Sequence, residues 1–143
     1  MHQELPVCEI IGDELIKIPS ADYEAMYESY TLRDYMGSGK VDMKFRLIEG
    51  DHFGKKLLRH FNVVLDKDWK TSGGFNVQAR SDYLREMKHL LPEGDLWANP
   101  ENLLGKSIIV KVELVKHDRR KIPLDDSSQY SVIRQLVRLK NEK

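Results

Sequence analysis

Hydrophobic and polar residues alternate most regularly over residues 40–47. One side of this pattern is apolar and the other is charged: Val41, Met43, Phe45 and Leu47 are on the first, and Lys40, Asp42, Lys44 and Arg46 are on the second. A period of two residues predicts a β-strand that buries one face. Because a glycine-bearing turn follows and another apolar run begins at residue 55, we expect a half-buried antiparallel hairpin with a basic outer surface.

The second arm of this hairpin, residues 55–65, has apolar side chains at both odd and even positions. Shifting a strand by one residue turns every side chain to the other face, so the pattern does not define which side is buried. The neighbours Arg59 and His60 cannot both face the solvent. One of them points outward and the other inward.

Three helix or strand segments can be placed outside this hairpin. Residues 21–32 fit both a strand and a helix, and we favour a strand because the glycine-rich turn MGSGK follows. Residues 81–91 predict a short helix, with Ser81 or Asp82 as the N-terminal cap. Residues 104–116 alternate as a second strong strand.

The remaining segments have weaker patterns. Residues 1–18 contain short apolar runs broken by glycine and proline, which is typical of an extended arm or a first strand. Residues 65–80 mix lysines, aromatic residues and two adjacent glycines, and they predict a loop. Residues 130–140 fit a strand, a helix, or one followed by the other.

These elements amount to about five strands, with one helix between the third and the fourth. This order is typical of a mainly β fold, a five-stranded Greek-key barrel of the oligonucleotide-binding (OB) type. A small α+β sandwich would give similar periodicities. A chain of 143 residues forms one compact domain, which we place at residues 19–143, after an arm or first strand at residues 1–18.

Composition narrows the functional classes. The 23 Lys and Arg residues balance the 23 Asp and Glu residues, so a nucleic-acid site requires local separation of charge. The single Cys8 forms no intramolecular disulfide, and no secretion signal or apolar run of about 20 residues is present. We therefore expect a soluble protein of the reducing cytoplasm that makes no use of a membrane.

The sequence offers no catalytic or metal-binding motif. Residues 100–107 end in Gly-Lys-Ser like a phosphate-binding loop, but Pro100 replaces the first glycine and the segment leads into a strand. The five histidines are scattered, and none lies near the cysteine in sequence. We expect neither an enzyme nor a bound cofactor or metal.

Single-stranded DNA binding fits the residues better, since it needs cations along the phosphates and aromatic faces for the bases. The predicted strands and turns supply the cations, and a glycine-bearing loop supplies the aromatic rings. The candidate contacts are Lys44, Arg46, Lys55, Lys56, Arg59, Lys70, Lys111, Arg119, Arg120 and Lys121 for phosphates, and Trp69 and Phe75 for bases.

A family resemblance points the same way. A Tyr-Glu-Ala strand opening, KFRLIEGDHFGKKLLRHFNVV, SDYLRE, LLGKSIIVKVELV and QYSVI follow one another over roughly residues 19–137. This succession resembles small single-stranded-DNA-binding proteins of bacteriophages and mobile plasmids, of the OB-fold class. The resemblance implies an accessory protein of DNA replication or recombination in a bacterial cytoplasm. Such proteins end in an acidic tail, whereas this sequence ends RLKNEK, so recruitment of partners through a tail is not expected.

The sequence thus predicts non-enzymatic binding of single-stranded DNA. Further partners to consider are replication or recombination proteins and a second copy of the chain. The alternative is a protein-interaction module of the same fold that binds a host or phage protein, which the zero net charge favours.

Overall fold

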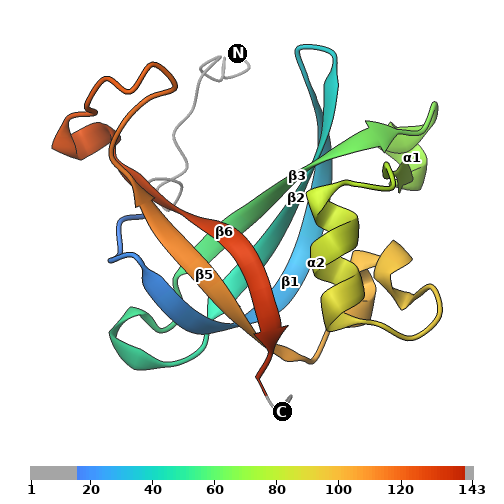
Figure 1. The fold of residues 1–143 in the computed structure, drawn as a ribbon, viewed down its shortest axis with the longest axis horizontal. Coiled ribbons are helices and arrows are strands. Elements are labelled where there is room, and N and C mark those ends of the chain that lie inside the picture. The colour runs from blue at the N-terminus through green and yellow to red at the C-terminus, as the bar shows by residue number, and fades with distance from the viewer. Residues whose placement is uncertain (1–15, 141–143) are drawn as a thin grey trace, which may run out of the picture.

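The computed structural model describes residues 16–140, and their architecture is mainly β, as predicted (Figure 1). Within this range six strands form one antiparallel sheet in the order β4-β3-β2-β1-β5-β6. The strands are β1 (Ala21–Tyr35), β2 (Ser38–Leu47), β3 (Lys56–Leu65), β4 (Phe75–Asn76), β5 (Ser107–Val115) and β6 (Tyr130–Leu139). Most of the arm predicted at residues 1–18 lies outside the described residues.

Short helices occupy the connections between the strands. They are the α-helices α1 (Trp69–Ser72) and α2 (Asp82–Leu90) and the 3-10 helices η1 (Gly50–His52), η2 (Leu96–Ala98), η3 (Pro100–Leu103) and η4 (Asp126–Ser128). The predicted cap of α2 is confirmed, because the Ser81 hydroxyl accepts a hydrogen bond of 3.2 Å from the backbone N–H of Leu84. The segment predicted as a loop, residues 65–80, instead contains α1 and the short strand β4.

The strand assignments follow the alternation of apolar residues. All four apolar side chains of β2 are buried in the core, including Phe45. The two ambiguous segments both become strands, β1 and β6. Strand β1 places the alternate residues Ala25 and Tyr27 in this same core, which a helix would have turned to opposite sides. Strand β6 places Ile133 and Leu136 there, three residues apart because its register with β5 shifts between them.

The sheet curls until β6 lies beside β3 (Figure 1). Within residues 16–140, however, no ladder of backbone hydrogen bonds joins these two strands. The prediction of a five-stranded barrel therefore needs correction, since the sheet has six strands and is open between β3 and β6. The predicted helix, α2, follows the extra strand β4 and precedes β5.

A carboxylate from α2 lies in the gap between β3 and β6. Glu86 accepts hydrogen bonds from Arg59 Nε of β3 at 3.1 Å and from the backbone N–H of Leu136 in β6 at 2.8 Å. Its second oxygen accepts from Arg59 Nη2. A side chain thus satisfies a backbone donor that a β3–β6 ladder would need, which explains why the sheet stays open here.

Two buried tyrosines attach the long connection before β5 to the core. The Tyr27 hydroxyl donates to Glu101 of η3, and the Tyr83 hydroxyl donates to the carbonyl of Trp97 at 2.8 Å. Burial raises the pKa of both hydroxyls well above the ordinary tyrosine value. Both groups therefore stay protonated and act as hydrogen-bond donors over the physiological range.

Candidate nucleic-acid interface

The side of β1, β2 and β3 that faces away from the core carries most of the charge of these strands. The register places Lys40 opposite Asn62, Lys44 opposite Leu58, and Arg46 opposite Lys56, while Arg33 of β1 lies opposite Lys40. We call this surface the outer face. Its members are Glu28, Arg33, Lys40, Asp42, Lys44, Arg46, Lys56, Leu58, His60 and Asn62.

Asp42 is the central carboxylate of the outer face, and it is almost fully buried by its partners. Arg33 Nε and His60 Nδ1 each lie 2.6 Å from one of its oxygens. Burial alone would raise the pKa of Asp42, but the hydrogen bonds from His60 and Arg33 outweigh it and hold the pKa below its ordinary value of 3.8. Asp42 therefore remains ionised and holds the Arg33 and His60 side chains in place.

We expect the Asp42 carboxylate to stabilise the fold at neutral pH and to lose this effect in acid. Because the pKa is lowered in the folded state, the stabilisation is complete above the unfolded value near 3.8 and disappears as pH falls through the folded value. Urea unfolding of the wild type and of Asp42→Asn at about pH 5 and about pH 2.5 checks this. The difference in stability between the two proteins should shrink in acid, and an unchanged difference would contradict the assignment.

The second carboxylate, Glu28, reaches the outer face through a β-bulge. The β1–β2 register shifts between Tyr27 and Ser29, which leaves Glu28 as the extra residue. Its two oxygens lie 3.1 Å from Arg46 Nε and 3.3 Å from Lys56 Nζ. Glu28 thus links cations from two neighbouring strands.

The outer face keeps an excess of positive charge after these pairs are counted. The members named above include five Lys and Arg residues, Arg33, Lys40, Lys44, Arg46 and Lys56, and two carboxylates, Glu28 and Asp42; Asp22 and Glu24, which face outward earlier on β1, adjoin this surface and reduce the excess there. Lys44 is exposed and has no ion-pair partner within residues 16–140. Lys40 donates only to the amide oxygen of Asn62. These two lysines are the cations most available to an incoming anion.

Three of the predicted phosphate contacts, Lys44, Arg46 and Lys56, come together on the outer face. The sequence analysis did not select Arg33, Lys40 or His60, which lie among them. The alternation over residues 40–47 already placed Lys40 on the charged side, but Arg33 and His60 could be assigned only once the cross-strand register was known.

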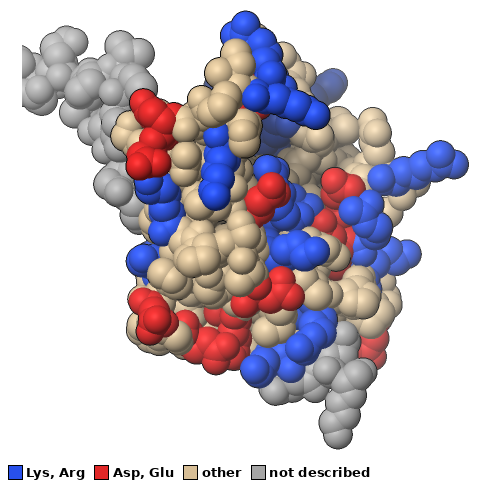
Figure 2. Space-filling model, turned by 60° about the vertical axis from the view of Figure 1, so that its left-hand side comes forward, with Lys and Arg blue, Asp and Glu red and all other residues tan. Residues whose placement is uncertain are grey.

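The other predicted cations lie elsewhere. Lys55 precedes β3 and its Nζ lies 3.1 Å from His52 Nδ1, while Lys111 of β5 lies opposite Asp22. Arg119, Arg120 and Lys121 are exposed in the β5–β6 connection, where the Asp118 carboxylate accepts from the backbone N–H of Arg120. In the view of Figure 2, Lys and Arg are interleaved with Asp and Glu and form no single continuous basic area.

Arg59 does not belong to an external surface. His60 points outward to Asp42, so Arg59 points inward, where its side chain is only 11% exposed and pairs with Glu86. The guanidinium also lies over the ring of Phe61, 4.1 Å from the centroid. We therefore remove Arg59 from the candidate contacts, because binding a phosphate would require it to leave a buried carboxylate.

The two predicted stacking residues differ. Phe75 packs edge to face against Tyr30 and Tyr83, with ring centroids 5.9 and 5.5 Å apart, and it belongs to the rim of the core. Trp69 is partly exposed on α1, where it lines a pocket with Thr31 and has Lys70 Nζ 5.6 Å from its ring centroid. Trp69 and Lys70 remain candidates, and Phe75 does not.

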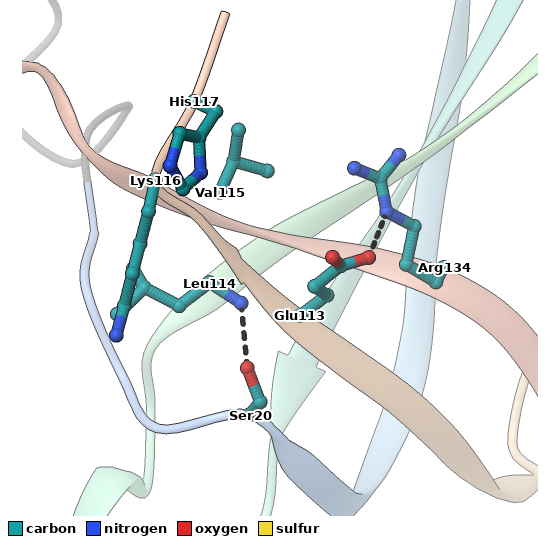
Figure 3. Close-up of a pocket in the computed structure, with 7 residues that line it drawn as sticks. All are labelled: Ser20, Glu113, Leu114, Val115, Lys116, His117 and Arg134. Atoms are coloured by element: carbon teal, nitrogen blue, oxygen red, sulfur yellow. Dashed lines mark hydrogen bonds and ion pairs between the residues drawn. The ribbon is translucent and has the colours of Figure 1, made fainter. Parts of the chain in front are cut away.

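A further pocket of about 400 Å³ lies where β5 and β6 diverge (Figure 3). Glu113 and Arg134 pair across it at 2.6 Å, and the Ser20 hydroxyl accepts from the backbone N–H of Leu114 at 2.9 Å. Lys116 and His117 line its other end (Figure 3). Since its arginine is already paired with a carboxylate, this pocket offers less uncompensated charge than the outer face.

Comparison of the chain with protein-family models gives no match, and comparison with curated proteins gives none either.

Over residues 16–140, no three side chains of the metal-ligating types gather into a site. No helix in that range is both long and apolar enough to cross a bilayer. Residues 100–107, which end in Gly-Lys-Ser, form η3 and then enter β5, so the segment leads into a strand as predicted. The proposed function therefore rests on the geometry of the outer face.

Proposed function

We propose that this protein binds single-stranded DNA without catalysing a reaction, and that the outer face holds the phosphates. One observation carries the proposal: Lys40, Lys44, Arg46 and Lys56 lie on neighbouring strands in register, on a side of the sheet that does not pack against the core. Cations arranged in this way match a sequence-independent chain of phosphates. A role in phage or mobile-element replication or recombination rests on the family resemblance and depends on this binding.

The strand order supports the proposal at the level of the fold. OB folds are five-stranded, partly open Greek-key barrels that bind oligonucleotides on the face of their second and third strands. Strands β1, β2, β3, β5 and β6, with α2 inserted before β5, fit such a barrel, and β4 is then an addition. The outer face would lie on the surface that this fold uses.

The carboxylates of the outer face define how binding would proceed. Asp42 and Glu28 occupy the positions that phosphates would take, because Asp42 already holds Arg33 and His60 and Glu28 already holds Arg46 and Lys56. Incoming phosphates compete with these carboxylates for Arg33, Arg46 and Lys56, whereas Lys40 and Lys44 are available at once. We therefore expect moderate affinity with a strong dependence on salt.

Titration of a labelled oligo-dT at two salt concentrations tests the proposal. Neutralising about four phosphates of a single strand predicts an affinity loss of roughly 50-fold between about 50 and about 200 mM salt. A dissociation constant above about 10⁻⁴ M at the lower concentration would reject the proposed function, as would a salt-independent signal. The same titration with oligo-rU compares RNA with DNA.

Removing a competing carboxylate should strengthen binding. In Glu28→Gln, Arg46 and Lys56 lose their anionic partner, and one negative charge leaves the outer face. We expect the affinity for oligo-dT at about 50 mM salt to rise by roughly three- to tenfold. The control is Glu113→Gln, which removes a carboxylate paired with Arg134 on β6 and should leave affinity unchanged. A fall in affinity for Glu28→Gln would contradict the outer face as the phosphate site.

A protein-interaction module is the second candidate. It is favoured by the balanced charge of the whole chain and by large apolar side chains that are exposed away from the outer face, such as Leu104 and Ile122. Capture from a nuclease-treated bacterial lysate separates the two functions. A partner retained after nuclease treatment, together with no affinity for oligo-dT, would favour this candidate.

A further inference from the structure

The β1–β2 hairpin extends well past β5. Strand β1 pairs with β5 only over Ala21–Met26, whereas its pairing with β2 continues to Tyr35 (Figure 1). The end of the hairpin is therefore flanked on one side only, by β3, whose pairing with β2 begins at Gly39. A hairpin of this kind depends strongly on its turn.

The turn at the end of this hairpin contains an unfavourable residue. Met36 and Gly37 lie between the last cross-strand pair, Tyr35 and Ser38, and both have positive φ, at 52° and 85°. Positive φ at both central positions is the type I′ pattern, which strongly favours Asn-Gly. The Asp34 carboxylate supports the turn by accepting from the Gly37 N–H at 2.9 Å. A methionine with positive φ raises the energy of the backbone, whereas asparagine adopts this conformation more readily.

The side chains at the tip are also unusually exposed for their type. Met36 is 87% exposed and Tyr35 is 45% exposed. Neither side chain belongs to the core cluster, so packing does not explain the backbone strain at Met36. Strain that persists without a packing reason is often found where a residue contacts a ligand.

The tip continues directly into the outer face. Arg33 Cζ lies 5.8 Å from the centroid of the Tyr35 ring, and Arg33 also pairs with Asp42 on the outer face. Lys40 lies opposite Arg33 on β2. A ligand whose phosphates lie on the outer face would therefore bring its bases to Tyr35 and Met36.

We propose that Tyr35 and Met36 form a stacking platform for unpaired bases, an inference that rests on the proposed function. Arg33 covers one side of the Tyr35 ring and leaves its other side for a base, because aromatic rings accept a cation and a base on opposite faces. Met36 inserts beside that base as an apolar wedge, as flexible apolar side chains do between base steps. This platform takes the role that the sequence analysis gave to Phe75.

The variant Met36→Asn tests the platform without weakening the fold. Asparagine tolerates a φ of 52° and prefers this turn, so the melting temperature should stay equal or rise. We expect the affinity for an oligo-dT carrying one 2-aminopurine to fall by about five- to tenfold in Met36→Asn and in Tyr35→Thr. We expect the wild type to quench the 2-aminopurine fluorescence on binding and both variants to lose this quenching. The salt dependence should not change, because neither substitution removes a cation.

Leu104→Asn is the control, since it replaces another exposed apolar side chain by asparagine, in the turn before β5. It should leave both affinity and quenching as in the wild type. Unchanged affinity and quenching in both tip variants, with a wild type that binds, would overturn the platform alone. Absence of wild-type binding would overturn both the platform and the proposed function.

Discussion

Replacing Glu86 with alanine should lower the free energy of unfolding by about 3–5 kcal/mol. Glu86 is 3% exposed and its partner Arg59 is 11% exposed, so the substitution leaves a guanidinium nearly buried without a counter-ion. It also removes the acceptor of the Leu136 N–H, which is not otherwise bonded across the gap between β3 and β6. Urea unfolding followed by circular dichroism measures the loss.

Two further variants show whether the effect comes from the buried pair. Arg85→Ala breaks an exposed pair with Asp82 on the same helix and should cost less than about 1 kcal/mol. Arg59→Met combined with Glu86→Gln removes both charges and keeps an acceptor for Leu136, so it should be more stable than Glu86→Ala. Equal losses for Glu86→Ala and Arg85→Ala would show that Glu86 does not hold β3 and β6 together.

Reversing two charges on the outer face should nearly abolish nucleic-acid binding. Lys44→Glu combined with Arg46→Glu removes two of the proposed phosphate contacts and places two carboxylates in their positions. Affinity for oligo-dT at about 50 mM salt should fall by at least about 50-fold, and the slope of log K against log salt should decrease by about 1.4. Fluorescence anisotropy at several salt concentrations measures both quantities.

The stability of this double variant must be measured with its affinity. Lys44 is exposed and Arg46 is about one-third exposed, so we expect thermal unfolding to change little. Arg85→Glu combined with Lys88→Glu changes the net charge equally on exposed positions of α2 and should keep most of the affinity. If Lys44→Glu with Arg46→Glu instead melts early, these side chains hold the fold and the assignment of the outer face is wrong.

The sequence predicted the elements whose apolar residues follow a single period. The alternation over residues 40–47 defined β2 and its buried side, and the cap at Ser81 located the start of α2. In both cases neighbouring residues alone decide the structure. The strand at 107–115 was predicted for the same reason.

Features that depend on distant contacts could not be predicted. Strand β3 carries apolar side chains on both of its faces, so its sequence does not show which face is buried. The inward orientation of Arg59 depends on Glu86, which is 27 residues away in sequence. The gap between β3 and β6 could not be predicted either, because Glu86 of α2 fills it by accepting from the Leu136 N–H. The short elements α1 and β4 lack a periodic pattern, and Phe75 is fixed there by contacts with Tyr30 and Tyr83.

The candidate site was predicted only in part, for a similar physical reason. Lys44 and Arg46 could be placed together because they lie on one strand at a spacing of two residues. The counter-ion of Arg46, Glu28, was not identified, because only the bulge turns it toward Arg46 and Lys56. Tyr35 and Met36 were not selected, since their exposure depends on how far the hairpin extends past β5.

The bulge at Glu28 also interrupts the alternation of β1. Inward side chains occupy positions 23, 25 and 27 before it and positions 30 and 32 after it, which a strand of this length without a bulge could not achieve. A chain lacking residue 28 would have an unbroken alternation and would keep all five of these side chains inward, in regular register with β2. Loss of this residue should therefore spare the interior and act on Arg46 and Lys56, which would lose their shared carboxylate.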